Sequence, residues 1–159
     1  MGHRCFASPR VRVYIGAVRE QGMYEPGRVH KEGTMSSKGR VLIVDDEPDI
    51  SDFLQAFFEL KGYESVVANS GFEAVEKVKS FHPHVILLDV RMPQMDGIET
   101  LREIRKVDAD VGVIMVTAVH ETGIGREALK LGAADFVTKP IDLDYLETTV
   151  MVKVINMIN

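Results

Sequence analysis

Five polar residues follow short apolar runs of the chain, and their types suit one kind of chemistry. Asp45 and Asp46 follow one run, Asp89 a second, Thr117 a third and Lys139 a fourth. Carboxylates gathered in one place repel one another unless a cation lies among them. All-oxygen ligands favour a hard cation, and Mg²⁺ takes few carboxylates while keeping several waters. With Lys139 as a second cation and Thr117 as a donor, negative charge could arrive on Asp89, and carboxylates do act as nucleophiles that form acyl phosphates.

The elements that must position these residues alternate from residue 40 onward. Expected strands cover 41–44, 66–68, 85–88, 111–116 and 136–137, and expected helices begin near 48, 70, 96, 122 and 142. Near-continuous apolar strands indicate burial on both faces, hence a parallel sheet with helices on each side. Right-handed crossovers make this a doubly wound α/β fold. In such folds the functional crevice lies at the carboxyl ends of the strands, where the five polar residues are expected.

Helical spacing of apolar residues indicates which helix faces are buried. The first helix carries such residues over 50–60, among them Phe53, Phe58 and Leu60, and the last helix is expected to bury residues down to Ile158. The fourth helix contains Gly123 and Gly125, each of which weakens a helix by about 1 kcal/mol relative to alanine. We therefore expect that helix to start late or to fray, with fast amide exchange across 121–127.

Composition and charge limit the class of protein. The 159 residues are 45% hydrophobic and 27% charged, which is a globular composition. The apolar runs are far too short to span a bilayer, so no membrane association is expected. A single cysteine cannot form an internal disulfide, which favours a reducing compartment, and we expect a cytoplasmic protein.

The charge is divided unevenly between the start and the rest of the chain. Residues 1–39 carry seven Lys/Arg and three Glu, whereas residues 40–159 carry twelve Lys/Arg and 21 Asp/Glu. The first segment has glycines and prolines but no sustained period, so we interpret 1–39 as a disordered N-terminal extension. Met35 would be a natural start, and the sequence does not tell whether residues 1–34 exist in the native protein. The acidic remainder argues against non-specific nucleic-acid binding.

Four motifs at the strand ends resemble those of the receiver domain of two-component response regulators. They are Val-Leu-Ile-Val-Asp-Asp-Glu at 41–47, Leu-Leu-Asp-Val-Arg-Met-Pro-Gln-Met-Asp-Gly at 87–97, Val-Thr-Ala at 116–118 and Gly-Ala-Ala-Asp-Phe-Val-Thr-Lys-Pro at 132–140. Together and in this order they are specific. The resemblance covers about 40–158 and implies a flavodoxin-like sheet of five parallel strands in the order 2-1-3-4-5, with five helices.

The resemblance also implies a role for each site residue. Asp89 would be the phosphoacceptor, and Asp46, Asp89 and the backbone carbonyl of Arg91 would bind Mg²⁺, with Asp45 acting through a bound water. Lys139, Thr117 and the backbone N–H of Ala118 would contact the phosphoryl group. Thr117 and Phe136 would form a switch that changes the surface of the fourth helix, the fifth strand and the fifth helix. The Lys139–Pro140 bond would be cis.

As a function, the resemblance implies a phosphoacceptor response regulator in a phosphorelay and not an enzyme with an external substrate. The donor would be a sensor histidine kinase or a histidine phosphotransfer protein, and a downstream protein would read the switched surface. Because the sequence ends after the fifth helix, we expect a stand-alone, chemotaxis-regulator-like receiver without direct DNA binding. Arg91 and Val119, each two residues past a site residue, offer no obvious way to orient an attacking water, so we expect a long-lived phosphoryl group.

Several alternatives compete with parts of this interpretation. Gly123-Ile-Gly125-Arg-Glu-Ala128 matches the dinucleotide fingerprint, but about six residues separate it from the preceding strand, and carboxylates stand where a phosphate turn is needed. Haloacid-dehalogenase-like phosphatases also use a strand-end Asp but want a second Asp where Arg91 stands. The protein could instead be a phosphorelay intermediate or a fragment of a longer regulator.

Overall fold

A computed structural model describes residues 36–159 of the chain. Most of the expected extension lies outside the described residues. The interpretation of residues 1–39 as a separate, disordered segment therefore stays a prediction.

The elements alternate between strand and helix along the described residues. They are β1 (Arg40–Val44), α1 (Pro48–Leu60), β2 (Glu64–Ala68), α2 (Gly71–Phe81), β3 (Val85–Asp89), α3 (Gly97–Val107), β4 (Gly112–Ala118), the 3₁₀ turn η1 (Val119–Glu121), α4 (Thr122–Lys130), β5 (Asp135–Lys139) and α5 (Leu143–Ile158). The strands form one sheet in the order β2-β1-β3-β4-β5, and every neighbouring pair is parallel. The predicted doubly wound fold, with this strand order, is confirmed.

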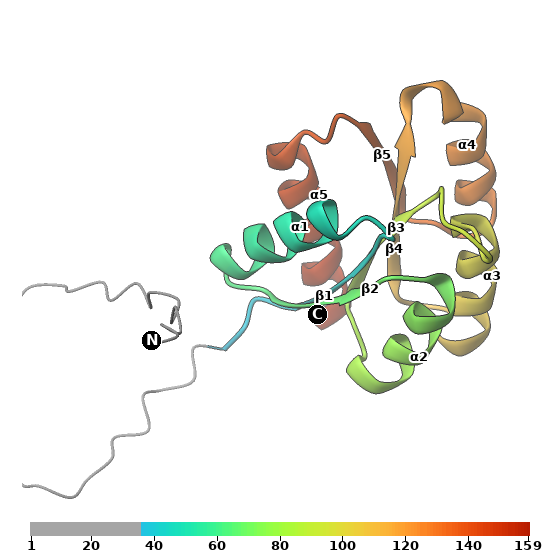
Figure 1. The fold of residues 1–159 in the computed structure, drawn as a ribbon. Helices are drawn as coiled ribbons and strands as arrows, with labels where there is room; N and C mark the ends of the chain where they lie inside the picture. Colours follow the sequence, from blue (N-terminus) through green and yellow to red (C-terminus); the bar gives the residue numbers. More distant parts are fainter. Residues whose placement is uncertain (1–35) are drawn as a thin grey trace, which may run out of the picture. The chain divides into compact units, whose positions relative to one another are not determined.

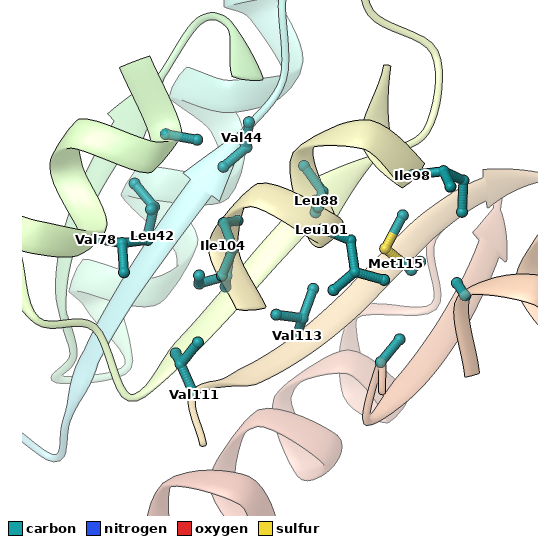
Figure 2. Close-up of a cluster of buried hydrophobic side chains, with 14 of the residues drawn as sticks. Leu42, Val44, Val78, Leu88, Ile98, Leu101, Ile104, Val111, Val113 and Met115 are labelled. Carbon is teal, nitrogen blue, oxygen red and sulfur yellow. The ribbon is translucent and has the colours of Figure 1, made fainter. Parts of the chain in front are cut away.

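Helices cover both faces of the sheet because each strand is apolar on both sides. Figure 1 shows α1 and α5 on one face and α2, α3 and α4 on the other. On the first face, Phe58 of α1 and Leu146 of α5 pack on Ile43 and Leu87 of the sheet. On the second face, Leu101 packs among the strand residues Leu88 and Met115, among other buried side chains (Figure 2). The two cores hold the strands in register, so the strand ends are fixed relative to one another.

The loop after β3 is held by the start of α3. The Asp96 side chain accepts a hydrogen bond from the Glu99 backbone N–H at 2.9 Å, and the Glu99 side chain accepts one from the Asp96 N–H at 3.0 Å. This reciprocal pair is a capping box, which satisfies two N–H groups that the first helical turn leaves without partners. The Gly97 N–H also donates to the Val90 carbonyl at 2.9 Å. The loop that follows Asp89 is thereby tied back to the strand.

Some expectations about burial and element bounds were wrong in detail. Phe53, Leu60 and Ile158 are 56%, 88% and 59% exposed, although their spacing placed them with the buried residues. Only a narrow stripe of α1 and of α5 touches the sheet, so apolar residues at the margin of the stripe face solvent.

β5 spans five residues instead of two because backbone pairing with β4 continues to Lys139. α4 begins at Thr122, ahead of both glycines, and therefore does not start late.

None of the helices between residues 36 and 159 is long and apolar enough to cross a membrane.

Candidate functional site

The carboxyl ends of β1 and β3 bring three acidic side chains together. One carboxylate oxygen from each of Asp45, Asp46 and Asp89 lies within 4.8 Å of the others. The strands β1 and β3 are adjacent and parallel, so the residues that end them lie at the same edge of the sheet. The acidic cluster predicted from the strand ends is therefore present in the fold.

Asp89 is a buried carboxylate of the cluster, and it has a cationic partner. Its side chain is 5% exposed, and Lys139 Nζ lies 3.4 Å from its Oδ1. Burial raises the pKa of Asp89 to about 6, and the negative charge of Asp45 adds to the rise. Lys139 acts in the opposite direction and lowers this pKa. Above pH about 6 a charged Asp89 thus lies in a site that favours additional positive charge.

The other two carboxylates differ in burial. Asp45 is 3% exposed, and the Glu47 backbone N–H donates to its Oδ1 at 2.9 Å. Burial raises the pKa of Asp45, and this hydrogen bond and Lys139 oppose the rise. Asp46 is partly exposed. A cluster of oxygen donors that is open on one side fits a hard cation that keeps waters in its coordination shell, which is the chemistry of Mg²⁺.

Thr117 is the last residue but one of β4, the strand that pairs with β3 up to Asp89. The hydroxyl of this residue is buried, and Oγ1 has no hydrogen-bond partner among the residues that the structure describes. A buried hydroxyl without a partner costs free energy, so it is available to a group that arrives from outside. Ala118 follows at the strand end and is paired in register with Lys139 of β5. Strand pairing therefore brings Thr117, Ala118 and Lys139 to the carboxyl end of β4 and β5.

Gly97 is a site feature that the sequence did not single out. A Cβ atom at this position would contact the Asp89 carbonyl oxygen and would lie 2.8 Å from the Val90 Cα atom. Both contacts are with backbone, which cannot rotate away as a side chain can. A glycine is needed here for the close approach of α3 to the end of β3, and this approach fixes the position of Asp89.

Phe136 lies in β5, three residues before Lys139, and packs against the core on the α4 side of the sheet. A Cβ atom at Gly125 of α4 would lie 2.9 Å from the ring. The ring is partly buried and rests against the α4 backbone at a position where alanine would not fit. Gly125 therefore serves packing against Phe136, whereas the sequence indicated only a weakened helix.

Arg91 and Glu121 form an ion pair at the rim of the site that the sequence did not predict. Two guanidinium nitrogens of Arg91, Nε and Nη2, contact Glu121 Oε1. The Glu121 side chain is 3% exposed, whereas that of Arg91 is 74% exposed. The pair joins the loop after β3 to the turn η1 after β4. Its two partners are 30 residues apart in the chain, which left no local pattern from which to predict their contact.

The known proteins that this chain resembles belong to one family. The family model for the response regulator receiver domain matches residues 41–151. Regulatory protein AtoC of Escherichia coli is 44% identical over 116 residues, which cover 73% of this chain and 25% of AtoC. Chemotaxis protein CheY of Bacillus subtilis is 38% identical over 106 residues, which cover 66% of this chain and 88% of CheY. The solved receiver domain of the Francisella response regulator 1452 has a TM-score of 0.70 and 34% identity, covering 74% of this chain and 98% of that one.

The chain belongs to the response regulator receiver domain family. It is therefore a phosphoacceptor signalling domain of two-component systems and not an ordinary enzyme. Receiver domains interact with histidine kinases and downstream targets, and they generally bind Mg²⁺ at an acidic cluster of the kind found here. The chain spans a quarter of the length of AtoC and of the transcriptional regulatory protein ZraR of Klebsiella oxytoca.

Proposed function

We propose that this protein accepts a phosphoryl group on Asp89 from a histidine kinase or a histidine phosphotransfer protein, with Mg²⁺ as cofactor. The observation that carries the proposal is the buried Asp89 carboxylate, which lies within 4.8 Å of two further carboxylates and 3.4 Å from Lys139 Nζ. The three carboxylates repel one another and need a cation among them. The negatively charged phosphoryl group needs the same positive charges, from Mg²⁺ and Lys139, when it binds. Asp45, Asp46, Asp89 and the Arg91 backbone carbonyl would hold Mg²⁺.

In the proposed reaction an ionised Asp89 oxygen attacks phosphorus, and a new O–P bond forms while the P–N bond of phosphohistidine breaks. The electron pair of that bond leaves with the imidazole, which takes up a proton. When bound, Mg²⁺ neutralises charge on the phosphoryl oxygens and positions them. Lys139 binds another phosphoryl oxygen, and the Thr117 hydroxyl and the Ala118 N–H donate to the remainder.

The same contacts supply the proposed switch. A phosphoryl group on Asp89 brings extra negative charge and three acceptor oxygens to the end of β3. The Thr117 hydroxyl, which has no partner in the described part of the chain, is drawn toward them. Space then opens into which Phe136 turns from its place against Gly125, and the surface of α4, β5 and α5 changes. A downstream protein that prefers this surface shifts the population toward it.

The output step has two candidate forms. CheY, of which this chain covers 88%, supports a receiver that acts through protein–protein contact. AtoC and ZraR, of which it covers 25%, carry the names of regulatory proteins, and ZraR that of a transcriptional one. The expectation of a stand-alone receiver without direct DNA contact therefore stays a prediction.

Mixing the phosphorylated protein with histidine phosphotransfer domains separates an output receiver from a phosphorelay intermediate, because only the latter passes its phosphoryl group on.

The proposed role of Mg²⁺ is tested by its removal. We expect rapid phosphoryl incorporation from acetyl phosphate in millimolar Mg²⁺ and a decrease of about 100-fold or more when EDTA is added, because three carboxylates then repel the incoming anion. Incorporation is measured by intact-protein mass. Addition of excess Mg²⁺ to the chelated sample is the control and should restore the rate. Equal incorporation with and without EDTA would show that no divalent cation takes part.

The lifetime of the phosphoryl group is a separate prediction. Arg91, two residues after Asp89, has donors but no acceptor and contacts Glu121, so it cannot act as a base toward water. We expect the group to persist for minutes or longer. The measurement is the loss of label after the phosphodonor is removed. Decay within seconds would show that another group orients the attacking water.

A further inference from the structure

The ion pair between Arg91 and Glu121 has an asymmetry that gives it a further role. The Glu121 carboxylate is nearly removed from water, and its second oxygen, Oε2, has no hydrogen-bond partner among residues 36–159. The Arg91 side chain is mostly exposed. It also lines a groove of about 650 Å³ between the loop after β3, α3 and α4, together with Met92, Ile98 and Ile124 among others. Glu121 is held in place, whereas Arg91 has room to move.

Arg91 is the nearest cation along the chain to Asp89 but does not pair with it. In the described part of the chain, the ion pair of Asp89 is made by Lys139, and the ion pair of Arg91 is made by Glu121. A guanidinium presents a planar fork of donors that fits phosphoryl oxygens, and it is always charged. A phosphoryl group two residues away would compete with Glu121 for this guanidinium.

We propose that Glu121 is a positioning residue that keeps the Arg91 guanidinium off Asp89 in the unphosphorylated protein, and that a phosphoryl group on Asp89 takes this guanidinium from Glu121. The proposal rests on the proposed function of Asp89. A buried carboxylate that loses its cation is strongly unfavourable. Glu121 must then turn toward water, and because it directly precedes α4, the start of that helix moves with it.

The start of α4 has little of its own to resist such a movement. Glu121 occupies the N-cap position without a capping hydrogen bond from its side chain, and Gly123 follows in the first turn. Apart from the neighbouring residues and backbone of its own helix, no atom of the described residues lies within 4 Å of the place where a Gly123 Cβ would be. A second ion pair, Arg102–Glu127 at 3.4 Å, joins α3 to α4 further along, and both its side chains are 53% exposed. Of these two ion pairs, Arg91–Glu121 contains the residue that lies nearer to Asp89 along the chain.

This competition can be measured because the two equilibria are coupled. If a phosphoryl group weakens the Arg91–Glu121 ion pair, then loss of that ion pair must strengthen binding of the phosphoryl group by the same factor. The probe is beryllofluoride, a tetrahedral anion that mimics a phosphoryl group, titrated in the presence of Mg²⁺ and followed by calorimetry. We expect Glu121→Gln to bind it about fivefold or more tightly than wild type, because the freed Arg91 then serves the anion. Glu127→Gln, which removes the corresponding carboxylate of the second ion pair, should bind it as wild type does.

The decisive comparison is made on an Arg91→Gln background, where Glu121→Gln should give no gain in affinity. A structural effect of Glu121 alone would give the same gain on both backgrounds and would overturn the proposal, as would equal affinity of Glu121→Gln and wild type. Because Arg91 is exposed, Arg91→Gln should fold, and without the anion its amides at 121–127 should exchange faster than those of wild type. The anion should raise the wild-type exchange rate to that of Arg91→Gln, and equal rates in the two proteins without the anion contradict the proposal. If wild type does not bind the anion at all, the proposed function fails too.

Discussion

Alanine at position 97 is expected to displace the phosphoacceptor and to reduce phosphoryl incorporation by about 100-fold, since misplacement of a reacting group by about 1 Å has an effect of that size. The new Cβ would contact the Asp89 carbonyl oxygen and lie 2.8 Å from the Val90 Cα atom, so the end of β3 and α3 must separate. We also expect the free energy of unfolding to fall by about 2–3 kcal/mol, as in other overpacked sites. Initial rates with acetyl phosphate and urea unfolding measure the two effects.

Gly123→Ala is the matched control for this substitution. It lies in the first turn of α4, and in the described part of the chain its Cβ would meet no atom within 4 Å outside its own helix. Alanine there should raise the free energy of unfolding by up to about 1 kcal/mol through helix propensity and leave the rate of incorporation unchanged. Wild-type incorporation by Gly97→Ala would mean that the close approach of α3 does not position Asp89.

Asp89→Asn is expected to be more stable than wild type when Mg²⁺ is absent. The folded protein holds the pKa of Asp89 at about 6, above its ordinary value of 3.8, because the carboxylate is buried beside Asp45. An acid with a raised pKa binds its proton more tightly in the folded state, so stability is lost as the pH rises from about 4 to 6 and stays lower above that. At pH 8 the difference between the variant and wild type should be up to about 3 kcal/mol.

Urea unfolding of both proteins between pH 4 and pH 8 checks this pH dependence. The gain of the variant should grow between pH 4 and 6, remain constant above, and shrink when millimolar Mg²⁺ is added to wild type. Asp52→Asn makes the same chemical change at an exposed position of α1 and should show little gain at any pH. A variant less stable than wild type at pH 8 without metal would mean that the ionised Asp89 carboxylate does not destabilise the folded protein.

The fold was predictable because local patterns and the rules of parallel sheets agree. Apolar runs such as 85–88 can only be buried on both faces, and that requirement leads directly to a helix-covered parallel sheet. The exposed Phe53 and Leu60 were not predictable in the same way. Helical spacing says which residues share a face, but the width of the buried stripe depends on how α1 lies on the sheet.

The candidate site was predictable to the extent that it follows strand ends. The adjacent parallel strands β1 and β3 bring Asp45 and Asp89 together, and Lys139 ends β5 at the same edge of the sheet, beyond β4. The Arg91–Glu121 pair was not predictable, because it joins two loops and depends on side-chain directions that no periodic pattern encodes. The need for glycine at position 97 was not predictable either, because it arises from the close approach of α3 to the backbone at the end of β3.

The most direct test of the central proposal compares phosphoryl incorporation in wild type and Asp89→Asn with acetyl phosphate and Mg²⁺. The amide of the variant fills the same space but lacks the nucleophilic oxygen. We expect wild type to gain one phosphoryl group by intact mass and the variant to gain none under the same conditions, while both remain folded by circular dichroism. Equal incorporation by the two proteins would contradict the assignment of Asp89 as the phosphoacceptor.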